Sequence, residues 1–131
     1  MAFEAAVLNW NDCEWTIARE KMRYVTYQAQ NMTATLTEVT PGHTPGPHAH
    51  PYEQLVMILQ GECDFYVDGK PYHLTPGCVL TVPEGVDHYI VATGSGPVLN
   101  LDIFTPRRDE RVESRIASSE EARADIPLFS K

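Results

Sequence analysis

The chain has 131 residues, a length that suits one domain with a single continuous core. Apolar residues make up 43% of it and charged residues 21%, which excludes a disordered chain. The formal net charge is −8, and between Arg23 and Arg107 the only base is Lys70, so a nucleic-acid partner, which requires a basic face, is excluded as well.

Residues 1–15 are expected to form a lead-in segment anchored by Trp10 and Trp15. The segment carries acids where a secretion signal carries bases, and no apolar run approaches the roughly 20 residues of a membrane-spanning helix. We therefore expect a cytoplasmic protein without membrane contact. In that reducing compartment, Cys13, Cys63 and Cys78 are expected to be small buried side chains rather than disulfides.

Residues 16–106 have the pattern of a β-barrel. Turn signals such as Pro-Gly, Asp-Gly and Ser-Gly recur about every 8–12 residues, between short segments rich in Val, Ile, Leu, Thr and Tyr. Asp68-Gly69 predicts a two-residue hairpin turn. The run 55–59 (LVMIL) is apolar on both faces, so one face should fill the barrel while the other meets another sheet or subunit. A homodimer is the quaternary state that we expect.

Two histidine motifs lie within residues 42–92. Their fixed positions are Gly42, His48, His50, Gly61, Gly77, Pro83, Gly85 and His88. Residues two apart on a strand face the same side, so His48 and His50 should project together into the barrel, and the later turn delivers His88 from a more distant strand. The spacing resembles the two motifs of the cupin superfamily, although Ala92 stands where the second motif usually has asparagine. The resemblance implies an all-β, RmlC-like jelly-roll barrel in a single domain with short irregular terminal extensions.

The converging histidines predict one divalent transition metal, because imidazole nitrogen suits iron, nickel, manganese, zinc or copper better than calcium or magnesium. The fourth ligand is expected to be Gln54 through its amide oxygen, with Glu53 as the alternative, although Glu53 should face the other side of its strand. This neutral ligand set leaves the metal its full charge and favours an anionic small molecule. The competing interpretation is a polar pocket without metal, lined by hydrogen-bonded core histidines. His43 and His73 fall outside the spacing and are expected at the surface or in turns.

The last expected strand brings a second group of polar residues. Asp102 and Phe104 share a face with Asn100, and an acid among apolar neighbours is costly unless it is paired or lines a wet pocket. Arg108 follows the strand. It either pairs with Asp102, closing the barrel end, or reaches over the barrel mouth.

Residues 102–110 have the pattern Asp-x-Phe-x-Pro-x-Arg-x-acid. Together with the HxHPxEQ pattern of the first motif, it resembles the small cupins of pectin and alginate breakdown. Those enzymes linearise 4,5-unsaturated uronates into open-chain keto-deoxy sugars. The resemblance implies a metal held by His48, His50, Gln54 and His88. It also implies an isomerase in which Asp102 moves a proton, Arg108 grips the substrate carboxylate and Phe104 forms a pocket wall.

Two other functions fit the same pattern. One is a different metal-dependent cupin enzyme, a dioxygenase or a small-substrate lyase, with a tyrosine as base. The candidate tyrosines are Tyr24, Tyr27, Tyr52, Tyr66 and Tyr89. The other is a non-catalytic cupin that binds or senses a small ligand.

Residues 107–131 are expected to form a tail with a short helix near 119–125, because Ser118-Ser119-Glu120-Glu121 resembles a helix start. The apolar segment 126–129 (IPLF) should dock on its own barrel or on a neighbour. Beyond Arg108, no residue of the tail is expected to take part in catalysis.

Overall fold

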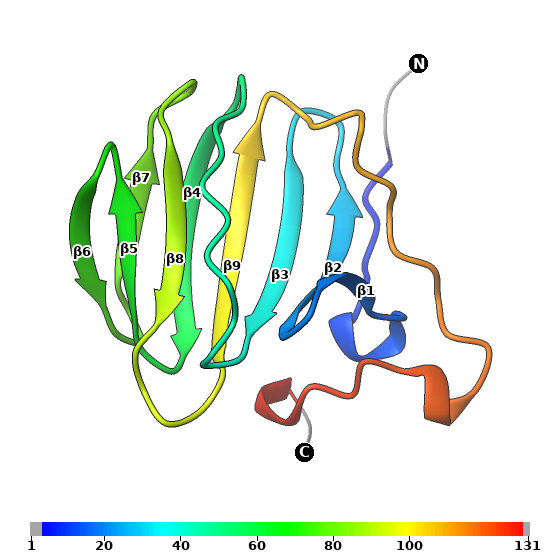
Figure 1. The fold of residues 1–131 in the computed structure, drawn as a ribbon. Helices are drawn as coiled ribbons and strands as arrows, with labels where there is room; N and C mark the ends of the chain where they lie inside the picture. The colour runs from blue at the N-terminus through cyan, green and yellow to red at the C-terminus, as the bar shows by residue number, and fades with distance from the viewer. Residues whose placement is uncertain (1–3, 130–131) are drawn as a thin grey trace.

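The computed structural model describes residues 4–129, which fold mainly into antiparallel strands. The strands are β1 (Thr16–Arg19), β2 (Met22–Gln28), β3 (Thr33–Val39), β4 (Glu53–Gln60), β5 (Cys63–Val67), β6 (Lys70–Leu74), β7 (Val79–Val82), β8 (His88–Ala92) and β9 (Val98–Thr105). They form a six-stranded sheet in the order β1-β2-β3-β9-β4-β7 and a three-stranded sheet in the order β6-β5-β8. Figure 1 shows the smaller sheet facing one part of the larger sheet, which extends past it toward β1. The predicted all-β jelly roll is confirmed.

Alternation along the central strands separates inward from outward side chains. In β4, Gln54, Val56 and Ile58 are buried, whereas the residues between them are half-buried. Gln54 lies opposite Phe104 of β9 and Val56 lies opposite Asp102. The apolar run 55–59 therefore fills the interior with only one of its faces.

Two turns depend on a backbone conformation that few residues adopt. Asp68 and Gly69, with φ of 51° and 77°, form the predicted hairpin turn between β5 and β6. Gly61 has a φ of +80°, and a Cβ there would lie 2.5 Å from the carbonyl oxygen of Pro97. Only glycine fits at position 61 without a shift of the backbone.

One end of the space between the sheets is filled by apolar side chains. This apolar end consists of Val39, Val56, Ile58, Cys63, Phe65, Leu74, Val82, Ile90 and Val98. Burying a side chain of this kind contributes roughly 1.5–3 kcal/mol, so the cluster is a principal source of stability. The polar end of the interior is formed by Gln54 of β4 and His88 of β8, together with Asn100 and Asp102 of β9, which lie opposite Ile58 and Val56. These polar residues form the candidate site.

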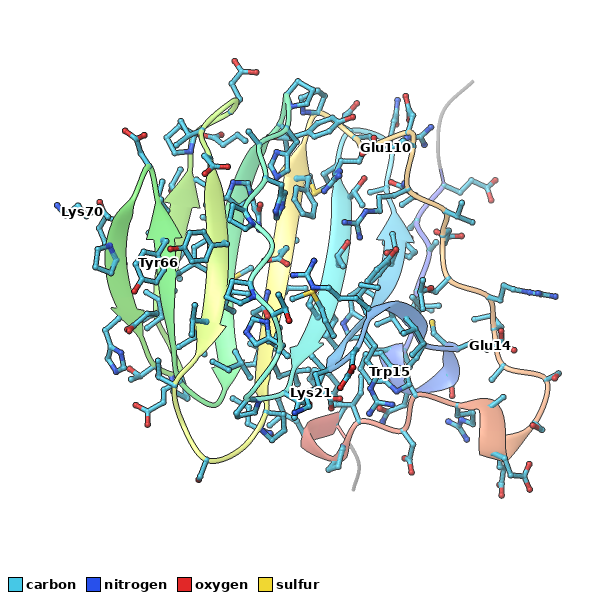
Figure 2. All side chains as sticks on the ribbon, in the orientation of Figure 1. Glu14, Trp15, Lys21, Tyr66, Lys70 and Glu110 are labelled. Atoms are coloured by element: carbon cyan, nitrogen blue, oxygen red, sulfur yellow. The ribbon has the colours of Figure 1, made fainter. Side chains whose placement is uncertain are left out.

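The two ends of the described chain cover part of the outer face of the larger sheet. A second apolar cluster forms there from Cys13, Val25, Leu36, Leu99, Ala124 and Ile126. The lead-in and the tail pair with each other, as in the 2.8 Å bond from Ala117 N to Asp12 O. Trp15, labelled in Figure 2, donates from Nε1 to Ala124 O at 3.2 Å. The apolar segment 126–129 thus docks on its own sheet.

Helical structure is limited, within residues 4–129, to single 3-10 turns at Trp10–Asp12, Glu120–Ala122 and Pro127–Phe129. The second turn lies within the region where a short helix was expected. No helix in this described range is long and apolar enough to cross a membrane. The cysteines are free thiols, and Cys13 and Cys63 are buried.

Candidate metal centre

Three histidines from two chain segments meet at the polar end of the interior. Residues 40–52 run alongside β8, where His48 and His88 exchange backbone hydrogen bonds of 3.1 and 2.9 Å. The ring centroids are 4.3 Å apart for His48 and His88, and 4.7 Å apart for His50 and His88. One candidate ligand atom from each histidine lies within 4.8 Å of the others. A single ion can therefore contact all three.

Backbone carbonyls fix the orientation of two of these rings. His48 Nδ1 lies 2.8 Å from Gly46 O, and His88 Nδ1 lies 2.9 Å from Val86 O. Because a carbonyl only accepts, each Nδ1 carries the proton and each Nε2 is left with a free lone pair. His88 Nε2 is buried and has no hydrogen-bond partner in the described chain, and burial lowers the pKa of His88 to about 4. A neutral ring with a free Nε2 is the form in which histidine binds a metal.

Gln54 completes the group. Its Oε1 lies 3.1 Å from His50 Nε2, and the residue is 5% exposed. Glu53, the alternative fourth ligand, is exposed because neighbouring residues of a strand face opposite sides. Three imidazole nitrogens and one amide oxygen therefore converge, and this donor set fits a divalent transition metal.

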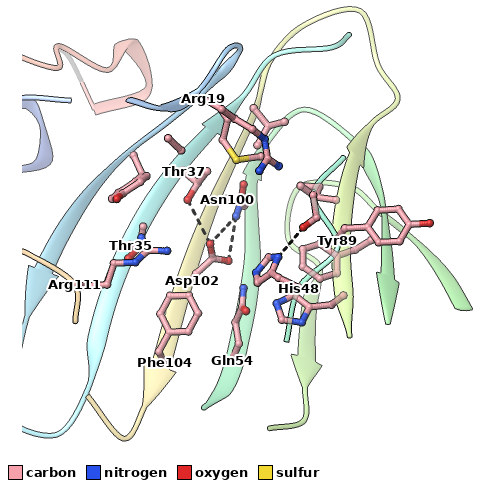
Figure 3. Close-up of a pocket in the computed structure, with 18 of the residues that line it drawn as sticks. Arg19, Thr35, Thr37, His48, Gln54, Tyr89, Asn100, Asp102, Phe104 and Arg111 are labelled. Atoms are coloured by element: carbon pink, nitrogen blue, oxygen red, sulfur yellow. Dashed lines mark hydrogen bonds between the residues drawn. The ribbon is translucent and has the colours of Figure 1, made fainter. Parts of the chain in front are cut away.

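Asp102 is buried on the cavity wall beside the histidines. Asn100 Nδ2 donates to both of its carboxylate oxygens at 3.0 Å, and Thr37 Oγ1 donates to Oδ2 at 3.4 Å (Figure 3). Burial raises the pKa of Asp102 to about 6, against the opposing effect of hydrogen bonds from Asn100 and Gln54. The predicted alternative of an Asp102–Arg108 pair is wrong, because Asn100, two residues earlier on the same strand face, takes that place.

Arg108 adopts the other predicted position, near the barrel mouth. Its guanidinium lies 4.6 Å from the ring centroid of Phe104, and its Nε donates to Glu110 at 2.8 Å. Tyr52 also donates to Glu110, at 2.6 Å. Desolvation acts to raise the pKa of Glu110, but the hydrogen bonds from Tyr52 and Arg108 lower it to about 2. The charge of Arg108 is therefore compensated by an ionised carboxylate.

Arg111, a tail residue beyond Arg108, also lines the cavity, and the expectation that this part of the tail is not catalytic stays a prediction (Figure 3). Its guanidinium lies 4.5 Å from the ring centroid of Tyr24 on β2. Gln28 holds this part of the tail against β2, since its Nε2 donates to Arg108 O at 2.8 Å and to Arg111 O at 3.0 Å. The one signal in the sequence was a second arginine three positions after Arg108, in a chain whose barrel has few bases.

These groups enclose a cavity of about 190 Å³. Three arginines line it, namely Arg19, Arg108 and Arg111. Pockets for drug-sized ligands measure roughly 300–1,000 Å³, so this one suits a smaller molecule. Its volume and its positive side chains together favour a small anion.

The remaining candidate residues are two histidines, His43 and His73, and the five tyrosines. His43 ends a turn, since its N donates to Thr40 O at 3.3 Å, so the expected turn position is confirmed. The alternative surface position is wrong, because His43 is 8% exposed and its Nε2 accepts from Ala92 N at 3.3 Å. The segment after β3 folds back under the end of β8 and buries the ring there. His73 is exposed, and of the five candidate tyrosines Tyr24 and Tyr89 line the cavity.

Known structures share this fold. KdgF from Halomonas sp. aligns with a TM-score of 0.76 at 21% identity, covering 83% of this chain and 100% of that chain. An RmlC-like cupin from Shewanella frigidimarina NCIMB 400 aligns with a TM-score of 0.74 at 24% identity, covering 83% and 97%. A predicted oxalate decarboxylase from Thermotoga maritima aligns with a TM-score of 0.69 at 19% identity, covering 77% and 99%. At these identities the likeness concerns the fold alone.

No curated protein matches the chain significantly. The model of the Cupin_2 family, described as a cupin domain, matches residues 35–104, which is more than half of the chain. The matched stretch contains the three histidines, Gln54 and Asp102. The chain therefore belongs to the cupin domain family.

Proposed function

We propose that the protein is a metal-dependent cupin enzyme that opens the ring of 4,5-unsaturated uronate monosaccharides. The observation that carries the proposal is the position of Asp102, a buried acid that lines one cavity with His48, His88 and three arginines. The residue pattern shared with the cupins of pectin and alginate breakdown supports the same reaction. The fold that the chain shares with KdgF agrees with it.

The three histidines and Gln54 would hold a divalent cation, which when bound supplies a Lewis acid for a substrate oxygen. Gln54 lies between the two parts of the site, because its Oε1 faces His50 and its side chain acts to lower the pKa of Asp102. Phe104, whose ring centroid lies 5.4 Å from that of His50, closes the wall beside them and excludes water.

Ring opening of an unsaturated uronate is an isomerisation. The C1 hydroxyl loses its proton, the C1 carbonyl forms and the bond from C1 to the ring oxygen breaks. The electron pair of that bond stays on the ring oxygen, which becomes an enolate on C5, and a proton added at C4 gives the ketone. In this proposal Asp102 takes the first proton and returns one at C4. The support is that Asn100 rather than an arginine holds its carboxylate in the cavity.

Loss of the ultraviolet absorbance of the conjugated C4=C5 bond measures this reaction. Protein loaded in turn with iron, nickel, manganese, zinc or copper should consume 4,5-unsaturated galacturonate. Asp102→Asn keeps the volume of the side chain and should lower turnover by roughly 10²- to 10⁴-fold. Asp109→Asn, which removes an exposed acid paired with Arg107, is the matched control and should behave as wild type.

Equal rates for wild type and Asp102→Asn would remove Asp102 from the mechanism. If no metal supports loss of the absorbance, the proposed reaction is wrong. Uptake of oxygen in its place would assign the site to the dioxygenases.

A further inference from the structure

Two arginines of the tail line the cavity, but their charges are compensated differently. Arg108 forms an ion pair with Glu110 at 2.8 Å. In contrast, none of the ion pairs within residues 4–129 involves Arg111. Arg111 is therefore the tail arginine with charge to offer a ligand.

The surroundings of Arg111 leave it ready for an anion. It is half-buried, and its Nη1 is buried without a hydrogen-bond partner among the described residues. The ring of Tyr24 supports the guanidinium at 4.5 Å, a contact that leaves the N–H groups free for another acceptor. A carboxylate, which accepts two parallel N–H bonds from a guanidinium, is the group that best satisfies such a donor.

The sheet order separates Arg111 from the histidine cluster. Tyr24 beneath Arg111 lies on β2, whereas Gln54 beside the histidines lies on β4, with β3 and β9 between them. Neighbouring strands lie roughly 4.8 Å apart, so about 14 Å of sheet separates β2 from β4. Asp102 on β9 lies between Arg111 and His48 (Figure 3). A small ligand bound at both ends would therefore cross over Asp102.

We propose that Arg111, supported by Tyr24, binds the carboxylate of the ligand, so that a uronate in the cavity directs its carboxylate toward β2 and its hydroxyl groups toward the histidines. This assignment rests on the proposed function in one respect, which is that the ligand is a small sugar acid. It differs from the role that the family resemblance gives to Arg108. Arg19 also lines the cavity, but it is exposed on the edge strand β1, where solvent screens its charge.

Binding of two probes tests the assignment. Galacturonate and galactose differ at C6, where one has a carboxylate and the other a hydroxymethyl group. Each is titrated calorimetrically into zinc-loaded protein and into protein stripped by a chelator. Wild type should prefer galacturonate in both forms, because Arg111 does not depend on the metal.

Arg111→Met keeps an unbranched side chain over Tyr24 and should lower galacturonate affinity roughly 10- to 100-fold, with galactose affinity unchanged. Arg111→Lys should recover part of the loss. Arg107→Met removes one charge from the same segment outside the cavity and should match wild type. Tyr24→Leu, which leaves the guanidinium intact, should produce a smaller loss than Arg111→Met. Circular dichroism verifies that each variant is folded.

The assignment is wrong if Arg111→Met binds galacturonate as wild type does, or if wild type does not distinguish the probes. It is also wrong if Arg108→Met or Arg19→Met alone abolishes the preference. Turnover of the unsaturated uronate separates this result from the proposed function. If the preference for galacturonate depends on Arg111 but the protein does not turn over the unsaturated uronate, the proposed reaction is wrong and the carboxylate site is right. If Arg111→Met turns over the unsaturated uronate with an unchanged KM, the carboxylate site is wrong and the proposed reaction is right.

Discussion

The two ends of the barrel interior both bury side chains of β4 and β8 but differ in chemistry, and the change occurs within single strands. On β8, His88 is 2% exposed and Ile90, two residues later, is 9% exposed. On β4, Gln54 is 5% exposed and Val56 is fully buried. Each pair shares one inward face, with the polar member at the candidate site and the apolar member in the apolar cluster, of which Ile90 also borders the cavity.

The ends differ in whether their own groups satisfy one another. Apolar side chains need only to be removed from water, so the apolar end is complete within the described chain. At the polar end several buried atoms lack a hydrogen-bond partner among residues 4–129. They are Thr35 Oγ1, His50 Nδ1, His88 Nε2, Asn100 Oδ1 and Arg111 Nη1. Folded proteins rarely leave such atoms unsatisfied, so this end has donors and acceptors available to a ligand or to water. We infer that one end supplies stability and the other supplies function.

Ile58→Ala should destabilise the protein by leaving a cavity at the apolar end. Ile58 is 1% exposed within that cluster, and truncation of such a residue lowers the free energy of unfolding by roughly 2–5 kcal/mol. Urea unfolding measures the loss. Ile17→Ala at a 68% exposed position should change it by less than about 0.5 kcal/mol. The metal content of folded Ile58→Ala should equal that of wild type, and a parallel loss of metal would contradict the division between the ends.

His48→Ala should weaken metal binding at the polar end without changing the free energy of unfolding. His48 is the exposed member of the three histidines, so its side chain adds little to packing. Removing a ligand should weaken metal binding by at least ~100-fold, since loss of an outer partner alone reaches that size. Elemental analysis after dialysis against a chelator measures retention, with His73→Ala as the exposed control. A decrease in the unfolding free energy of metal-free His48→Ala would show that the histidines also support the fold.

Gln54→Glu adds a negative charge where the candidate metal site has a neutral ligand. A carboxylate ligand carries a negative charge that attracts the cation, whereas an amide ligand is neutral. Metal affinity should therefore rise by about tenfold, or about 1.4 kcal/mol. The same charge lowers the Lewis acidity of the metal, so turnover should fall. Competition with a coloured chelator measures the affinity. Glu53→Gln, the opposite change on the exposed face of β4, should leave it unchanged, and weaker binding by Gln54→Glu would exclude Gln54 as a ligand.

Regular features of the fold could be predicted from the sequence because they depend on local rules. Asp68-Gly69 forms the predicted turn since both positions need a positive φ that these residues tolerate. The spacing of the two histidine motifs predicted that their histidines would meet, because strand alternation and short turns fix where each side chain points. The same alternation explains why Gln54 rather than Glu53 faces the histidines.

The tail could not be placed in this way. Arg111 reaches the cavity because Gln28, more than 80 positions earlier, binds its carbonyl, and because Ser114 Oγ accepts from Thr26 N at 2.7 Å. Contacts between residues so far apart leave no periodic signal in the sequence. The partner of Asp102 was missed for a related reason: charge favoured Arg108, whereas the fold placed Asn100 within reach.

His43 is a buried histidine outside the candidate site, and the effect expected from its titration is the smallest of the four. Burial lowers the pKa of His43, and the positive charge of Arg19 adds to the decrease. As pH falls below about 6.5, the unfolded chain takes up a proton that the folded chain resists, so the free energy of unfolding falls until pH reaches the lowered pKa. His43→Gln can still accept from Ala92 N but does not titrate, so between pH 7 and pH 5 it should lose less stability than wild type. Urea midpoints measured with chelator present, so that the other histidines contribute equally, make the comparison. Parallel pH profiles would mean that the ring of His43 takes up its proton as easily in the folded protein as in the unfolded chain.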